Sequence, residues 1–305
     1  MRESDNQFDD FLEARRRGGK IRRHGGVVLK IRSSIARTAL SLAWQVVGSM
    51  VLSVAGLRVA RQVIPLQVLE QSKDVVGNYL QTLGSIYAVL LAFVVFVVWT
   101  QFNDARAHVE REANELLDLY RVADGLSEPA RSRVLASAYK YAHDVLFSEW
   151  PAMSCGAPLH PGAGAAIDQL WGALLGAEPR PELDGQIFGE VLARLDDVSD
   201  ARSNRLTSSR TTIPLTLRLL LYIGAVTMVA SMYLFAVPSF AIHAAITAAL
   251  AGAISHVIYV IEDLDSCFRG HWQVSQAPFE RVLTQMTAAN DSPALAIGAG
   301  TSTTA

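Results

Sequence analysis

Four long apolar runs divide the chain and predict its main elements. A helix needs about 20 apolar residues to cross the hydrocarbon core of a bilayer. The strongest run, Leu83 to Phe102, contains no charged residue, and the runs Leu219 to Val237 and Ala241 to Ile261 are also clear. Thr38 to Leu57 is weaker because it includes Gln45 and several serines. We interpret it as a retained first span, since the apolar core of a secretory signal is shorter. The pattern therefore predicts four membrane-spanning helices.

Between the second and third runs, the segment from Asn103 to Thr212 has the periodicity of helices, with apolar residues at spacings of three and four. Neither Pro nor Gly interrupts Trp99 to Asp124, so span two is expected to continue straight into the first of these helices. Three further helices are expected, from Ser127 as N-cap to about Glu149, from Ala165 to Leu175, and from Pro181 to Ser209, with a loop beginning at Trp150-Pro151.

Composition supports a membrane protein of the all-α class. The 305 residues are 50% hydrophobic and 18% charged, with a mean hydropathy of +0.24, whereas soluble domains are about 25% charged. The net charge of −2 excludes a globally basic nucleic-acid-binding protein. We divide the chain into a basic arm (1–37), spans one and two (38–102), a helical domain (103–212), a hairpin of spans three and four that turns at Pro238-Ser239 (213–262), a C-terminal segment (263–287) and a disordered tail (288–305).

Charge predicts the orientation of the spans. Nine basic residues and no acidic residue lie between Arg15 and Arg37. By the positive-inside rule this arm stays in the cytoplasm, and four spans then return the C-terminus to the cytoplasm too. The same charges are expected to attract anionic membrane lipid. The helical domain would therefore also be cytoplasmic.

Two arginines on the last predicted helix of the helical domain form a candidate site. An apolar stripe from Ile187 to Val198 continues in phase to Arg202 and Arg205. Because an unpaired buried charge is unfavourable, these arginines need carboxylate partners. The candidates on the extension of span two are Glu112, Glu115 and Asp118. A structural clasp is the first interpretation, and a ring of arginines around an ion vestibule is the second. The domain has 11 basic and 17 acidic residues, and this net charge of −6 argues against a simple anion funnel.

Small residues recur at helical spacing in the spans. Such faces let membrane helices approach closely, so we expect them to pack, or alternatively to line a water-filled path. In span two these residues are Gly84, Ala88 and Ala92, and in span four they are Ala244, Ala248 and Gly252.

Three aromatic residues in span two, Phe93, Phe96 and Trp99, lie three residues apart. If they face a symmetry axis, they would form a hydrophobic gate that closes by dewetting. If they face lipid, the phenylalanines are ordinary membrane residues and Trp99 is an interfacial anchor. The sequence therefore offers a gate and leaves the lipid-facing alternative open.

Ionisable residues inside spans are functional candidates, and this chain has few of them. His256 lies near the end of span four, with Tyr259 and Asp263 on roughly the same face. One interpretation is a proton or ion relay, and the other is a hydrogen-bonded structural histidine. The motifs of nucleotide-binding, zinc-protease and hydrolase sites are absent from the sequence, and the seven histidines have no metal-ligand spacing. We therefore expect neither an enzyme nor a bound cofactor or metal.

Several segments resemble a bacterial membrane family known as a bestrophin-like domain. The resemblance is carried by Tyr87 to Val95, Trp99 to Arg106 and Val109 to Leu117, and by later landmarks. These landmarks are Glu149-Trp150-Pro151, Arg202 to Leu206, Ile213-Pro214, Leu264 to Gly270 and Pro278-Phe279. The chain departs from the pattern at Cys267-Phe268-Arg269-Gly270, where such families tend to have Pro-Phe before a glycine, and it lacks an Arg-Trp pair after span two.

The resemblance implies an oligomeric anion channel with four spans, cytoplasmic termini and a cytoplasmic helical vestibule. The first hypothesis is therefore a homo-oligomer in the bacterial inner membrane that conducts an inorganic ion, with chloride as one candidate, through a pore lined by span two. The second hypothesis is a non-conducting membrane scaffold whose cytoplasmic helices bind a protein partner. A third is a proton-coupled transporter that uses His256 and Asp263; the absence of inverted-repeat symmetry counts against it.

Overall fold

The structure is built from helices joined by short connections. The computed structural model describes residues 25–71, 73–156, 164–176 and 185–291, and these ranges contain no strand. The predicted all-α fold is therefore confirmed. The elements are α2 (Gly25–Val63), α3 (Leu66–Gln71), α4 (Lys73–Ala123), α5 (Ala130–Asp144), the π-helix η1 (Val145–Glu149), α6 (Trp150–Cys155), α7 (Ala165–Leu175), α8 (Gly185–Arg210), α9 (Leu215–Met232), α10 (Phe240–Asp265) and α11 (Ala277–Asp291).

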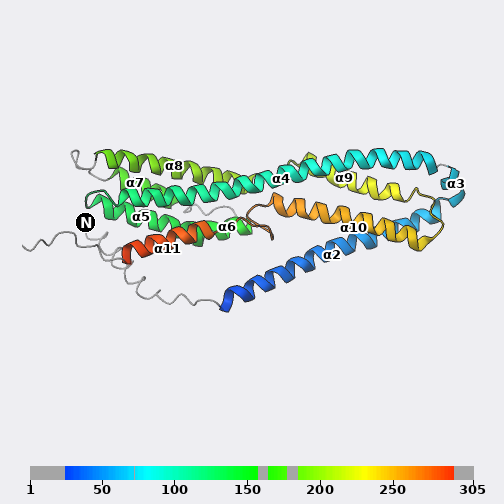
Figure 1. The fold of residues 1–305 in the computed structure, drawn as a ribbon, viewed down its shortest axis with the longest axis horizontal. Coiled ribbons are helices and arrows are strands. Elements are labelled where there is room, and N and C mark those ends of the chain that lie inside the picture. Colours follow the sequence, from blue (N-terminus) through cyan, green and yellow to red (C-terminus); the bar gives the residue numbers. More distant parts are fainter. Residues whose placement is uncertain (1–24, 72, 157–163, 177–184, 292–305) are drawn as a thin grey trace, which may run out of the picture.

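The molecule is elongated and has two halves that share one helix (Figure 1). Helix α4 has 51 residues, or about 75 Å at 1.5 Å per residue, and runs along most of the length. The spanning half contains α2, α3, α9, α10 and α4 up to Phe102. The helical half contains the rest of α4 together with α5, η1, α6, α7, α8 and α11. The expected continuation of span two into the helical domain is confirmed.

Four stretches of the described chain are long and apolar enough to cross a membrane. They are Leu42–Val63, Lys73–Ala123, Gly185–Met232 and Phe240–Asp265. The third stretch contains both α8 and α9, and the predicted third span corresponds to α9, which follows Pro214. This helix ends at Met232 rather than at Val237, and the chain then turns before Ser239 caps α10 by accepting a bond from the Ile242 N–H. The four predicted spans are thus present as α2, α4, α9 and α10.

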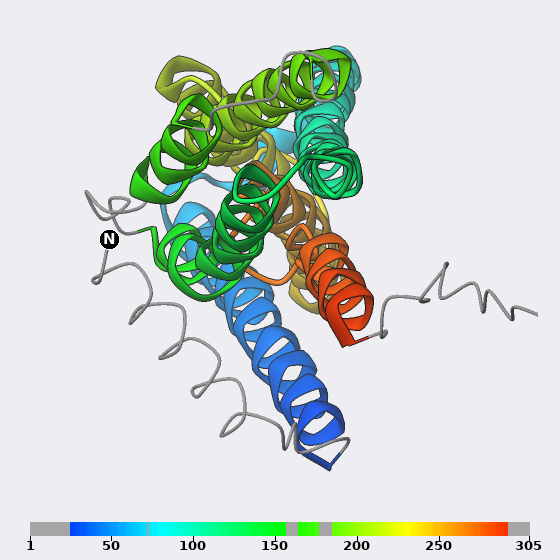
Figure 2. The same ribbon diagram turned by 90° about the vertical axis from the view of Figure 1, so that its left-hand side faces the viewer.

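Helix α10 lies at the centre of the spanning half and packs against α2, α4 and α9. It approaches α2 where a Cβ on Gly252 would lie 3.2 Å from the side chain of Met50. Nearby, the Ser49 hydroxyl donates to the Ala251 carbonyl at 3.4 Å. The N-terminal end of α2 points away from the other helices in both Figure 1 and Figure 2. Helix α2 therefore joins the bundle mainly through its second half.

Helices α4 and α9 approach through an aromatic residue and a glycine. The Tyr87 ring covers Gly224, and the Tyr87 hydroxyl donates to the Leu221 carbonyl at 3.0 Å. A Cβ on Gly224 would come 2.4 Å from the Tyr87 ring, which is far inside van der Waals contact. Close packing of these two helices therefore requires glycine at position 224.

Gly224→Ala should lower the apparent melting temperature of the purified protein in detergent. The added methyl group forces Tyr87 out of its position, and overpacking of this kind destabilises by about 1–3 kcal/mol. The control is Gly77→Ala on α4, where a Cβ meets nothing within 4 Å and alanine favours the helix. An equal loss in both variants would contradict a close contact at Gly224.

The core of the helical half is one buried apolar cluster. It includes Val109 and Leu116 of α4, Val191 and Leu195 of α8, and Phe279 of α11. These residues recur at helical spacings, as the periodicity of the sequence predicts. Helix α11 lies along the outside of this half, against α4 and α5. The C-terminal segment therefore belongs to the core of the helical half.

Three local predictions differ from the structure. The N-cap of α5 is Pro129, with no side-chain cap bond, instead of Ser127. Trp150-Pro151, expected in a loop, begins α6, because a proline in the first turn of a helix needs no N–H partner. Helix α11 continues to Asp291, whereas the tail was expected to begin at Ala288. The helix 165–175 is confirmed, and the expected loop around Pro179 lies outside the described residues.

Candidate functional site

One face of α4 is left uncovered by the rest of the described chain along both halves. In the spanning half this face carries large apolar side chains, of which Val89, Phe93 and Phe96 are 71%, 57% and 67% exposed. Beyond Trp99 the exposed residues become polar. They include Thr100, Asn103, Asp104, Arg111 and Asn114. Helix α4 therefore presents a continuous stripe that changes from apolar to polar where the helix passes into the helical half.

The structure places the three predicted gate residues on this stripe, and it distinguishes Trp99 from the two phenylalanines. The Trp99 ring stacks on Phe102 at a centroid distance of 6.2 Å and an interplanar angle of 23°. Its other neighbour is Trp272, which makes an edge contact at 6.3 Å and 69°. Trp99 thus contacts two aromatic rings and is 44% exposed, less than Phe93 and Phe96. A gate at these residues stays a prediction.

The small-residue faces have different positions within the chain. In span four, Ala244 and Ala248 are partly buried, and Gly252 is buried against α2. In span two, Gly84 lies near Met228 of α9, whereas Ala88 and Ala92 are exposed beside the aromatic stripe. Span two therefore meets α9 where its Tyr87 covers Gly224 of α9. Two of the small residues of span two, Ala88 and Ala92, lie on the uncovered face instead.

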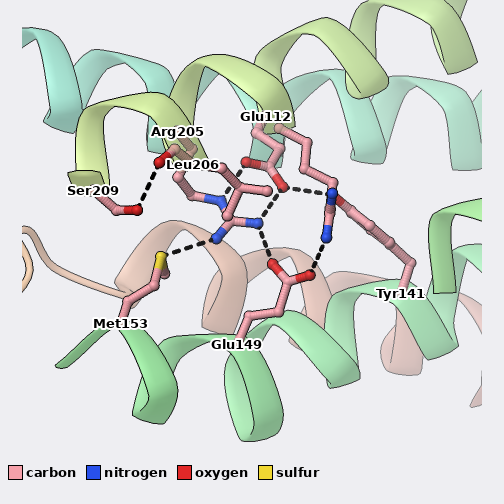
Figure 3. A network of polar contacts seen from close by, with 8 residues as sticks. Glu112, Tyr141, Glu149, Met153, Arg205, Leu206 and Ser209 are labelled. Atoms are coloured by element: carbon pink, nitrogen blue, oxygen red, sulfur yellow. Dashed lines mark hydrogen bonds and ion pairs between the residues drawn. The ribbon is translucent and has the colours of Figure 1, made fainter. Parts of the chain in front are cut away.

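Buried charged side chains form a clasp in the helical half (Figure 3). Arg205 of α8 donates from Nε and Nη2 to the two carboxylate oxygens of Glu112 on α4, at 2.6 and 3.0 Å. Its Nη2 also donates to Oε2 of Glu149 on η1 at 2.6 Å, and Arg202 donates to the other oxygen of Glu149 at 2.5 Å. Tyr141 of α5 donates its hydroxyl proton to Glu112 at 2.6 Å. We call Glu112, Tyr141, Glu149, Arg202 and Arg205 the clasp.

The clasp balances its charges in the core of the helical half, where only Arg202 of its charged side chains is partly exposed. Arg205 and Glu112 are both 0% exposed, and Glu149 is nearly so. Burial alone would lower the pKa of Arg205, but the charges of Glu112 and Glu149 outweigh it and raise that pKa above its ordinary value. Burial, followed by the charge of Glu112, raises the pKa of Tyr141 well above its ordinary value, so Tyr141 stays a proton donor. Two carboxylates face two guanidinium groups, which leaves no net charge.

The predicted partners of the arginines are brought together only in part. Arg205 contacts Glu112, which is one of the three predicted partners. Because the Arg205 side chain is fully buried, it does not line an ion vestibule. Glu115 instead pairs with Arg194 at 3.3 Å, and Asp118 pairs with Arg121. The partner that sequence reasoning missed is Glu149, which was expected at the end of the helix that follows Ser127 and was not matched to the arginines. In the structure, Glu149 continues the buried face that positions 142, 145 and 146 form.

The polar residues at the end of span four do not form the relay that the sequence suggested. His256 lies on the exposed side of α10, away from the contacts of Asp263. The Asp263 carboxylate accepts the backbone N–H groups of His271 and Trp272, each at 3.0 Å. The Tyr259 hydroxyl lies 3.1 Å from Nδ1 of the same His271. Asp263 therefore orders the loop after α10.

Two polar contacts at the ends of the spans were missed. Asp265 on α10 accepts the Ile213 N–H at 2.7 Å and an Arg218 guanidinium N–H at 2.8 Å, which ties the start of α9 to the end of α10. At the opposite end, Arg61 of α2 lies 3.2 Å from Nδ1 of the buried His243, and it also donates to the Val237 carbonyl.

Among the described residues, no group of three or more His, Cys, Asp or Glu is arranged to hold a metal ion.

These features define an all-helical membrane protein with four spans and a helical half that extends from the second span. Comparison with known proteins assigns the family. The family of the Bestrophin-like domain matches residues 47–279, and the chain therefore belongs to the bestrophin-like family. The predicted resemblance is confirmed. No protein with a curated description matches the chain in sequence.

Solved structures share the fold. A variant of a bacterial Bestrophin homolog from Klebsiella pneumoniae has a TM-score of 0.64 at 13% identity, over 80% of this chain and 99% of that chain. The same homolog, solved by Zn-SAD phasing, has a TM-score of 0.61 at 14% identity, over 79% and 98% of the two chains. A structure described as a membrane protein variant has a TM-score of 0.60 at 14% identity, over 80% and 98%. At these identities the likeness concerns the fold alone.

Proposed function

We propose that this chain is the subunit of a homo-oligomeric ion channel that conducts passively through a pore lined by α4. The observation that carries the proposal is the uncovered stripe of α4, in which exposed Phe93 and Phe96 precede exposed polar residues. Around a symmetry axis, the phenylalanines of several subunits form a dewetting constriction, and the polar stretch forms a hydrated vestibule. Membership of the bestrophin-like family supports this arrangement.

The clasp braces the vestibule in this proposal. It connects α4, which lines the pore, to α5, η1 and α8 through charged hydrogen bonds inside the core. Glu115, which pairs with Arg194 nearer the surface, adds a second link between α4 and α8. These contacts hold the polar part of α4 in a fixed register while ions pass.

The proposed location is the bacterial inner membrane, with both termini in the cytoplasm. The charge of the N-terminal arm, nine basic residues and no acidic residue between Arg15 and Arg37, supports this orientation. The helical half is then cytoplasmic, and the loop between α2 and α4 faces the other side. The arm would also attract anionic lipid of the inner leaflet.

Ion flux from liposomes that contain the purified oligomer tests the proposal, with chloride and potassium assayed separately. We expect passive flux of one of the two ions. Chloride flux would assign an anion pore, whereas potassium flux would assign a cation pore, which fits the net charge of −6 in residues 103–212. Absence of flux of both ions from a well-folded oligomer, across a range of pH and calcium concentrations, would contradict the channel and favour the scaffold that binds a protein partner.

A further inference from the structure

The loop between α10 and α11 is held rigidly although part of it is exposed. Asp263, in the last turn of α10, accepts the N–H groups of both His271 and Trp272. Gly270 precedes them with a φ of 77°, in the left-handed region that favours glycine. A Cβ at that position would also lie 2.1 Å from the Asp263 carboxylate. The turn is therefore fixed from within by one carboxylate and one glycine.

The two sides of this turn are anchored in the helical half. Phe268 is buried, and its ring makes an edge contact with Trp150 at 5.6 Å. Val274, on the other side, is buried too and donates its N–H to the Cys267 carbonyl at 2.9 Å. Because both sides are fixed, the position of the backbone that carries Trp272 is set by the core of the helical half.

The Trp272 indole reaches α4 at the point where the apolar stripe becomes polar. Trp272 is 50% exposed, and its indole ring makes an edge contact with the ring of Trp99. Trp99 lies between Trp272 and Phe102, in an edge contact on one side and a stack on the other. Trp99 also lies one helical turn after Phe96, on the same uncovered face of α4. Trp99 is therefore the next residue of this face on the helical-half side of Phe96.

We infer that Trp272 is a positioning residue of the constriction, which holds Trp99 beside Phe96 and so sets the resting permeability of the pore. This inference rests on the proposed function, because it takes the α4 stripe as the pore lining. The inference connects the loop that leads to α11 with the constriction. Through the contact between Trp272 and Trp99, this loop controls the width of the constriction. Movement of α11 would reach the pore by this route.

The test is a double-mutant cycle between Trp272→Ala and Trp99→Ala, with ion flux as the first readout. An edge-to-face pair should give a roughly 2- to 10-fold change in flux for Trp272→Ala in the chain that keeps Trp99. In the Trp99→Ala background, the same substitution should have little effect. Trp272→Phe keeps an aromatic edge and should recover most of the original flux. Equal factors in the two backgrounds would overturn the inference.

A second readout does not depend on conduction. Phe96→Cys is introduced together with Cys155→Ser, which removes the exposed native thiol. Cys267 can remain, because burial raises its pKa to about 11 and keeps it unreactive. The rate at which a water-soluble thiol reagent modifies position 96 should change with Trp272→Ala only when Trp99 is present. A rate that is insensitive to Trp272, or that changes equally in both backgrounds, would overturn the inference.

These readouts separate the inference from the proposed function. If the wild-type oligomer gives no flux and the modification rate still couples Trp272 to Trp99, the proposed channel fails, and the coupling shows only that Trp272 positions Trp99 beside Phe96. If the chain conducts and no coupling is found, the channel stands and the positioning role fails. Phe147→Ala removes a similarly exposed aromatic ring on η1, which contacts His143, and should change neither readout. Size-exclusion chromatography checks the oligomer, and Trp272→Phe replaces the alanine variant if that variant does not fold.

Discussion

Phe96→Ala is expected to raise the ion flux of the reconstituted oligomer on the order of tenfold. A ring of phenylalanines excludes water from a narrow pore, and each truncation to a methyl group widens the pore and lowers the barrier to hydration. A barrier reduction of about 1.4 kcal/mol is enough for a tenfold rise in rate. Phe96 is 67% exposed within the chain, so its removal should leave the fold of the subunit intact. The measurement is tracer or dye-reported flux from liposomes at a matched protein density.

The matched control is Ile223→Ala on α9, which truncates a residue of the spanning half that is similarly exposed and lies off the α4 stripe. It should leave the flux unchanged. Phe93→Ala, one turn before Phe96 on the stripe, should raise the flux as well. If the wild type conducts and Phe96→Ala has the flux of Ile223→Ala, Phe96 does not belong to the constriction and the stripe faces lipid.

The spanning half could be predicted because its physical signal is local. Each span is a run of about 20 apolar residues, and the unbroken path from Trp99 to Asp124 lacks the residues that end helices. Local sequence signals do not predict which faces of the spans pack against one another. Ala88 and Ala92 have the spacing of a packing face, yet α9 meets α4 at Tyr87 and Gly224, and the alanines stay exposed. The partner of a small face depends on the surface of the neighbouring helix.

The clasp shows the same limit for charged residues. The phase of Arg202 and Arg205 predicts a need for carboxylates, and α4 offers three in succession. Glu112 is selected because it shares the buried phase of Val109 and Leu116, a signal that was available in the sequence. Glu149 could not be found in this way. Its position depends on a π-helix, which shifts the helical phase by one residue, and on Pro151 being accommodated in the first turn of α6.

Arg205→Met should be the most destabilising single substitution in the helical half. It leaves Glu112 buried with Tyr141 as its remaining clasp partner, and it leaves Glu149 with Arg202. Removing one partner of a buried ion pair costs about 3–5 kcal/mol, because the remaining charge stays out of water. We expect a large fall in the apparent melting temperature and in the yield of folded oligomer. Arg205→Lys should recover little, since an ammonium group cannot reproduce the two parallel bonds to Glu112.

Two variants identify the uncompensated charge as the cause of this loss. Tyr141→Phe removes one hydrogen bond but leaves every charge of the clasp paired, so it should lose only about 1–2 kcal/mol. Arg205→Met combined with Glu112→Gln removes the stranded charge and should be more stable than Arg205→Met alone. If the double variant is no more stable, or if Tyr141→Phe is as damaging as Arg205→Met, the side-chain volume of the clasp and not its charge supports the helical half. In that case the link from α8 to α4 would depend on packing at Val109, Leu116 and Leu195, and the clasp would set only the register between the helices.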